Sequence, residues 1–263
     1  MNTKDTQRFT NAKERALKIM KEDLDPFHDV DHAEAVERTA LEIYASLDDI
    51  AKQEVYIEPL KLAAFWHDTS RKYIRSNLLL QPFFDGYISG RLARKHLKAV
   101  GYERKTTRYV ERIINCHETI LGTGEKKKLD ATMKIFSDAD WCETFSPKRI
   151  RRAIEKVEEK KFPRRTLNWY VLAISFVHTK NFMHIYFKKT EEIKNRYIQE
   201  LFSFMHTEKE RMKKIFYAPI YTHLYKKILP QLEHITNLHQ GIIADDKTKL
   251  TVQRNSKNGC KKE

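Results

Sequence analysis

The chain of 263 residues has little glycine, proline or cysteine. Seven glycines and seven prolines are too few for a turn-rich β fold, and this composition favours helices. The three cysteines match neither the spacing of a zinc site nor that of a disulfide framework. We therefore expect Cys116, Cys142 and Cys260 to be free thiols in a reducing compartment.

Long apolar runs are absent as well. No stretch approaches the ~18–20 apolar residues of a membrane-spanning helix. Residues 1–20 carry scattered charged and polar side chains where a signal peptide would have an apolar core. These absences predict a cytoplasmic protein with no membrane insertion.

Positive charge, in contrast, is in excess. Lys and Arg number 50 against 36 Asp and Glu, which gives a formal net charge of +14 at pH 7. Such a balance favours attraction of nucleotides, nucleic acid or anionic headgroups, but it carries no information about the fold. Because the basic residues are spread along the chain without a recognised nucleic-acid-binding motif, the charge alone does not identify the partner.

Amphipathic helical patterns follow one another with no Gly/Ser/Pro-rich linker between residues 20 and 235. We therefore expect an all-α fold. Residues 1–150 are expected to form one helical domain, residues 151–240 a helical extension packed on the same bundle, and residues 241–263 a disordered basic tail.

Two local patterns add expectations within this plan. Residues 75–90 are rich in aromatic residues and are broken by a proline and two glycines, so we predict an irregular loop there. It forms either a pocket wall or ordinary packing. Residues 149–161 alternate in charge, which indicates an exposed helix.

A histidine and an aspartate stand side by side at the end of an apolar helix. Leu60, Ala63, Ala64 and His67 follow the i, i+3, i+4, i+7 spacing, so the imidazole continues the buried face, and Asp68 comes next. A neutral imidazole beside a carboxylate suits a hard or borderline divalent cation. On its own, however, the dipeptide is better explained as a helix terminus satisfied by local hydrogen bonds.

Further ligand-type residues lie on the apolar faces of two other predicted helices. His32 shares one helical face with Val36 and Ile43, so it points inward. Asp140 likewise follows Phe136 on an apolar face. Because a buried carboxylate without a partner is costly, a bound metal would explain its position.

Taken in order, these residues resemble the HD superfamily of metal-dependent phosphohydrolases. That family has a His, then a His-Asp pair, then a distant Asp, all lining one site inside a helical bundle. The resemblance covers about residues 20–150, through the segments HDVDHAEAVERTA, LAAFWHDTSRKY, VERIINCHETI and KIFSDADWCETF. It implies an HD-domain helical bundle with additional C-terminal helices, in which His32, His67, Asp68 and Asp140 bind the metal.

Two positions depart from the family pattern. Ser70 stands where many members have glycine, and members with two metals carry extra histidines between the His-Asp pair and the last Asp. His117 matches the later of these histidines, while Asp85, or no residue, matches the earlier. These departures favour one metal ion over two. Of the two aspartates in SDAD, the resemblance favours Asp140 as the ligand, with Asp138 holding a neighbouring partner.

The resemblance also implies roles around the metal, which is a divalent ion such as Mn, Mg, Fe, Ni, Co or Zn. We expect Asp68 to ligate it and orient the attacking water, and Arg71 and Lys72 to hold the phosphate and stabilise developing charge. His28 and His117 are expected to contact the substrate. The alternatives are a solvated loop for Arg71, Lys72 and His28, and a satisfied core histidine for His117.

The implied reaction is hydrolysis of a phosphate ester or phosphoanhydride in a nucleotide or another small phosphorylated metabolite. The alternative from a different class is a non-catalytic HD-type nucleotide sensor or a nucleic-acid-binding protein. The complete set of four expected ligands favours the enzyme, because a degraded site is expected to lose a ligand first.

Overall fold

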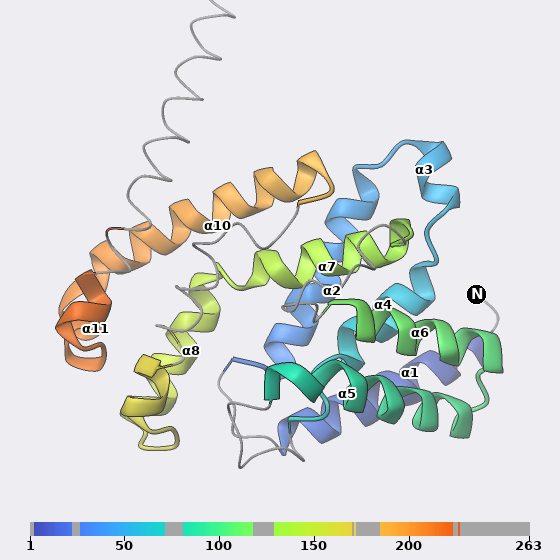
Figure 1. Ribbon diagram of the computed structural model, residues 1–263, viewed down its shortest axis with the longest axis horizontal. Coiled ribbons are helices and arrows are strands. Elements are labelled where there is room, and N and C mark those ends of the chain that lie inside the picture. Colours follow the sequence, from blue (N-terminus) through green and yellow to red (C-terminus); the bar gives the residue numbers. More distant parts are fainter. Residues whose placement is uncertain are drawn as a thin grey trace, which may run out of the picture.

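The structure is a computed structural model in which helices form all the regular structure of the described residues. These are residues 3–22, 27–71, 81–117, 129–169, 171, 185–222 and 226. No strand occurs among them (Figure 1). The predicted all-α fold is therefore confirmed. No helix in this part of the chain is long and apolar enough to cross a membrane.

The first part of the chain builds the larger hydrophobic cluster. Its helices are α1 (Thr3–Lys21), α2 (Val30–Ala45), α3 (Asp49–Gln53), α4 (Ile57–Trp66), α5 (Gln81–Ala99), α6 (Arg104–His117) and α7 (Ala131–Glu143). Helix α2 packs against α4 and α7, and α5 pairs with α6. The core between these helices includes Phe65, Trp66 and Phe136, all fully buried.

The second part of the chain builds a separate cluster. It contains α8 (Pro147–Glu158), α10 (Lys188–Thr207), α11 (Lys209–Ile215) and a helical segment at residues 164–169. Figure 1 shows α8 and α11 at one end of the molecule and α3 and α6 at the other. Helix α10 joins the two clusters, because Ile193 packs in the first and Ile198 in the second.

The predicted domain boundary between residues 150 and 151 stays a prediction. Residues 241–263, predicted as a disordered tail, lie outside the described residues. Of the three cysteines, Cys116 and Cys142 are described, and both are free thiols as expected.

Short polar signals set the ends of the helices that carry the site. Asp29 caps α2 by accepting a hydrogen bond from the backbone N of His32 at 3.1 Å, and Asp130 caps α7 in the same way through Met133 N at 3.0 Å. Gly101, which lies just after the end of α5, has a φ of 91°. Glycine adopts this left-handed conformation without the steric cost of a Cβ.

Two expectations about helices were wrong. Helix α5 begins at Gln81, so residues 81–90 are helical and only residues 75–80, which lie outside the described residues, remain from the predicted loop. Pro82 is tolerated because the first turn of a helix needs no backbone N–H donor. Helix α8 is not simply exposed: it packs against α10 and α11, and Arg149 and Ile154 are buried.

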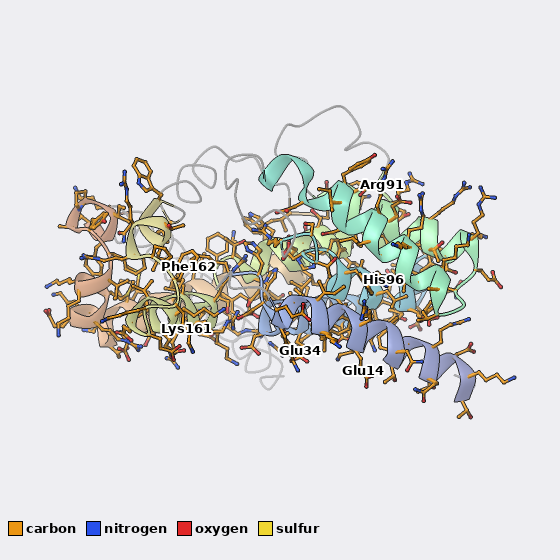
Figure 2. All side chains as sticks on the ribbon, turned by 90° about the horizontal axis from the view of Figure 1, so that it is seen from below. Glu14, Glu34, Arg91, His96, Lys161 and Phe162 are labelled. Carbon is orange, nitrogen blue, oxygen red and sulfur yellow. The ribbon has the colours of Figure 1, made fainter. Side chains whose placement is uncertain are left out.

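Charged side chains cover the outer faces of both parts. Glu14 on α1, Arg91 on α5 and Lys161 after α8, which are labelled in Figure 2, are all exposed. Exposed basic residues occur on both parts, for example Arg94 on α5 and Lys160 after α8. The positive charge is therefore spread over the described surface and does not single out one face.

Candidate metal centre

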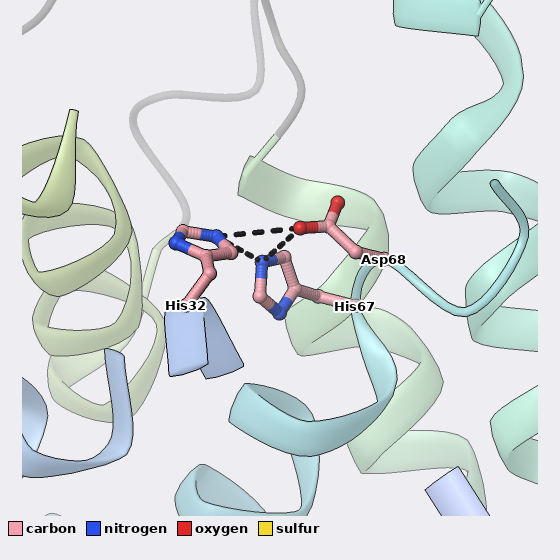
Figure 3. A group of neighbouring side chains, drawn as sticks. All are labelled: His32, His67 and Asp68. Carbon is pink, nitrogen blue, oxygen red and sulfur yellow. Dashed lines mark hydrogen bonds and ion pairs between the residues drawn. The ribbon is translucent and has the colours of Figure 1, made fainter. Parts of the chain in front are cut away.

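Three of the predicted ligands meet where α2 approaches the end of α4 (Figure 3). His32 is the third residue of α2, while His67 and Asp68 directly follow the last residue of α4. All three side chains are buried, and their ligand atoms lie within 4.8 Å of one another. The two Nε2 atoms of His32 and His67 are 3.1 Å apart.

Two carboxylate oxygens complete the cluster. Asp68 Oδ2 lies 2.9 Å from His67 Nε2 and 3.3 Å from His32 Nε2. Asp140 on α7 places Oδ1 3.2 Å from His32 Nε2 and 3.5 Å from His67 Nε2. The structure thus brings together the four residues that the sequence analysis named as ligands. The Asp140 side chain is 23% exposed, so solvent reaches the cluster on the α7 side.

The ring of His67 is oriented by the helix that carries it. Its Nδ1 lies 2.9 Å from the backbone oxygen of Ala64 and donates to it, because a carbonyl oxygen can only accept. The ring of Phe136 packs edge-on against it, with 5.5 Å between centroids. With Nδ1 as the donor, a neutral His67 presents the lone pair of Nε2 to the other ligand atoms, which is the arrangement of a metal-binding imidazole.

The buried charges of His67 and Asp68 are stabilised by each other and by neighbouring charges, a role that a bound cation can also fill. Burial opposes protonation of His67, but Asp68 and Asp140 outweigh it, and the pKa of His67 is raised to about 10. Burial also opposes ionisation of Asp68, yet the positive charges of His67 and Arg71 hold the pKa of its carboxyl well below the usual range.

The donor set fits a divalent cation. Within the described part of the chain, Asp68 Oδ2 is buried and accepts no hydrogen bond of good geometry. An ionised oxygen in that position is costly unless it meets positive charge. Two imidazole nitrogens and two carboxylate oxygens are ligands that borderline and hard divalent ions accept.

Arg71 links Asp68 to a second buried carboxylate. Its Nε donates to Asp68 Oδ1 at 3.2 Å, and its Nη2 lies 3.0 Å from Asp85 Oδ2. Asp85 Oδ1 accepts from Ser70 Oγ at 2.9 Å, and the Ser70 backbone donates to Ser89 Oγ at 3.0 Å. Arg71 is therefore not in a solvated loop, and Asp85 and Ser70 belong to the layer behind the ligands.

The two aspartates of SDAD make different contacts. Asp138 accepts hydrogen bonds from the backbone N of Tyr186 at 3.1 Å and of Phe187 at 3.2 Å, and from Thr190 Oγ1 at 2.6 Å. These contacts hold the start of α10 against α7. Asp140, two residues on, faces the histidines instead. The role of Asp140 as a metal ligand stays a prediction.

The remaining predicted residues have separate outcomes. His28 is 7% exposed, so the alternative of a solvated loop histidine is wrong. Its ring packs edge-on against that of His32, with 5.6 Å between centroids. Lys72 lies outside the described residues, and so does the side chain of His117, whose backbone ends α6.

One cation beside the site was not predicted. Arg149 on α8 is 5% exposed and donates from Nη2 to His28 Nε2 at 2.7 Å. Arg149 was missed because the alternating charges of residues 149–161 indicated an exposed helix. The i, i+4 spacing of Arg149 and Ala153 could have placed both on the buried face. Burial raises the pKa of the neighbouring Glu143, although the positive charges of Arg149 and Arg152 oppose this shift.

Comparison with known proteins adds one structural relative. No family model matches the chain, and no curated protein matches its sequence. The chain is similar to the crystal structure of a predicted HD superfamily hydrolase from an uncultured Thermotogales bacterium, with 17% identity and a TM-score of 0.46 over 74% of this chain and 89% of that one. This relative is from the family that the motifs resemble.

Proposed function

We propose that the protein is an HD-type metal-dependent phosphohydrolase. Its reaction is the cleavage, by an activated water, of a phosphate ester or phosphoanhydride in a nucleotide or small phosphorylated metabolite. The observation that carries the proposal is the meeting of His32, His67, Asp68 and Asp140, with nitrogen-to-oxygen distances of 2.9 to 3.5 Å. The divalent ion belongs to the set Mn, Mg, Fe, Ni, Co or Zn.

The protein supplies a fixed and largely buried ligand set. When bound, a divalent cation favours deprotonation of water and neutralises charge on phosphoryl oxygens. The bond from His67 Nδ1 to Ala64 holds the ring of His67, and Arg71 holds Oδ1 of Asp68 so that Oδ2 stays directed at the histidines. Such support from behind the ligands keeps the geometry constant during reaction.

The substrate side of the site is assigned to four residues. We place Arg71, Lys72, His28 and His117 there, as the residues that hold the phosphate and the rest of the substrate. The partial exposure of Asp140 supports an approach for water and substrate along α7. Burial of the other ligands strengthens electrostatic interactions at the reacting phosphate, because the local dielectric is low.

Phosphate release from a panel of nucleotides and phosphate esters tests the proposal. With Mn²⁺ present, we expect the wild type to act on at least one class of compound. Asp68→Asn should lose more than about 100-fold in rate, because even residues behind metal ligands cost 10–100-fold when they are changed. Asp49→Asn on α3 is the matched control, because it also neutralises an aspartate but at a side chain that is 99% exposed.

Two results would contradict the proposal. One is a folded, Mn²⁺-binding wild type that releases phosphate from no member of the panel. The other is full activity in Asp68→Asn. After the first result, nucleotide and nucleic-acid binding would be measured instead. Salt-sensitive binding that survives loss of the ligands would support the sensor or nucleic-acid-binding alternative.

A further inference from the structure

Arg149 is a buried cation without a carboxylate partner in the described residues. Its side chain is 5% exposed, and its one hydrogen bond there runs from Nη2 to His28 Nε2 at 2.7 Å. The Nε of Arg149 is buried with no hydrogen-bond partner in the same part of the chain. A guanidinium has five N–H donors and no acceptor, so most of its hydrogen-bonding capacity is left over.

The other arginines around the site are paired with carboxylates. Arg71 lies between Asp68 and Asp85. Arg152, one turn beyond Arg149 on α8, lies 3.1 Å from Asp29 Oδ2 and 3.6 Å from Asp31 Oδ2. Arg149 is therefore the exception among these three. Glu143 is near enough for its carboxyl to interact with the charge of Arg149, but no carboxylate forms an ion pair with Arg149 within the described residues. A buried charge without a direct ion-pair partner is costly, and the cost is reduced when an anion binds it.

The position of Arg149 connects this charge to the candidate metal centre. Its partner His28 packs against His32, with 5.6 Å between ring centroids, and His32 is one of the four candidate ligands. Because arginine can only donate, His28 Nε2 must accept the bond from Arg149. His28 thereby holds the guanidinium in place at the edge of the centre.

We infer that Arg149 forms a phosphate-binding subsite next to the metal centre, with His28 as its positioning residue. The planar fork of the guanidinium matches two oxygens of a phosphate group, and the burial of the site strengthens these charge-assisted bonds. The phosphate belongs to the substrate, and this part of the inference rests on the proposed function. The subsite lies on the side of α8, apart from Arg71, which is held by Asp68 and Asp85.

Binding of inorganic phosphate to the Mn²⁺-loaded protein, measured by isothermal titration calorimetry, tests the subsite without turnover. We expect Arg149→Met to weaken phosphate binding by about tenfold or more, because two charge-assisted bonds are lost. The phosphate affinity of Arg149→Lys should lie between those of the wild type and Arg149→Met, since lysine keeps the charge but loses the planar fork of donors. Equal phosphate affinity in the wild type and Arg149→Met would overturn the inference.

Arg152→Met is the matched control, because it removes an arginine from the same helix. We expect it to keep the phosphate affinity of the wild type but to unfold at lower urea concentration, since Asp29 and Asp31 lose their partner. Arg149→Met should unfold at the same or higher urea concentration than the wild type, because it removes a buried unpaired charge. If Arg149 had a purely structural role, Arg149→Met would unfold at lower urea concentration than the wild type. If Arg149→Met does not fold, Arg149→Lys decides by its phosphate affinity.

Kinetics with a substrate from the phosphate-release panel distinguish a substrate phosphate from free phosphate. We expect Arg149→Met to raise KM by about tenfold or more, with a smaller change in kcat. Lost phosphate binding with an unchanged KM would overturn the assignment to the substrate. Failure of the proposed function would give a different result, because the wild type would then release no phosphate from any member of the panel. The calorimetric titration would still compare the phosphate affinities of the wild type and the Arg149 variants.

Discussion

At the scale of single residues, two aspartates separated by one alanine have opposite tasks. Asp138 is buried and receives hydrogen bonds from Tyr186, Phe187 and Thr190 at the start of α10. Asp140 faces the two histidines. The side chains diverge because neighbouring i, i+2 positions of a helix point about 200° apart. A local motif such as SDAD therefore serves both the fold and the site.

This division predicts a reciprocal result for two isosteric substitutions. Asp138→Asn should lower the free energy of unfolding by about 2 kcal/mol, because hydrogen bonds to a charged acceptor weaken, and should leave Mn²⁺ affinity close to that of the wild type. Asp140→Asn should reduce Mn²⁺ affinity by more than about 100-fold with a smaller loss of metal-free stability. Urea unfolding and Mn²⁺ titration measure both quantities, and the reverse pattern would disprove the assignment.

At the scale of elements, α10 is tied to α2 by an ion-pair cluster. Glu42 on α2 accepts from Arg196 Nη1 at 3.3 Å and Nη2 at 3.0 Å, and Lys189 Nζ lies 3.4 Å from it. Bidentate geometry makes this pair stronger than an average surface pair, although solvent screens it because the side chains are partly exposed. The cluster holds α10 across the helix that carries His32.

We expect Glu42→Gln to lower the free energy of unfolding by about 0.5–1 kcal/mol at pH 7. The hydrogen bond from Arg196 lowers the pKa of Glu42 in the folded protein. The stabilisation is therefore present above the unfolded-state pKa and is lost as the pH falls through the folded-state value. Urea unfolding of both proteins from pH 7 to pH 3 measures this. A difference in unfolding free energy that grows toward acid pH would contradict this prediction. At pH 7, 1 M salt should reduce the difference between the two proteins, because it screens the ion pair.

At the scale of the whole molecule, the candidate centre joins three segments of the larger hydrophobic cluster. His32 comes from α2, His67 and Asp68 from the end of α4, and Asp140 from α7. A ligand that binds only the folded state stabilises it by mass action. Metal binding should therefore be visible as stability of the whole domain.

We expect Mn²⁺ at 100 times its dissociation constant to raise the free energy of unfolding by about 2.7 kcal/mol. Thermal unfolding with and without the ion measures the effect as a rise in Tm. His32→Ala should abolish the rise, because the site loses one of its two imidazoles. An equal rise in His32→Ala would place the bound ion elsewhere.

Much of the site was predictable because periodicity determines which way a side chain points from its own helix. The spacing placed His32 and His67 on buried faces, and it placed Asp68 at a helix end. The same reasoning failed for residues 81–90, because proline and glycine were read as breakers although a first-turn proline is compatible with a helix. Local rules describe each element but are weakest at its ends.

The sequence by itself determined the all-α class and the buried helical faces, which follow from local spacing, and its resemblance to the HD superfamily supplied the four candidate ligands. Only the tertiary structure decided that Asp138 secures α10, that Asp85 lies behind Asp68, and that Arg149 meets His28 across 121 positions of the chain. Those contacts depend on which helix packs opposite which. That choice is set by the complementary shapes of whole apolar faces, and no short stretch of sequence contains it.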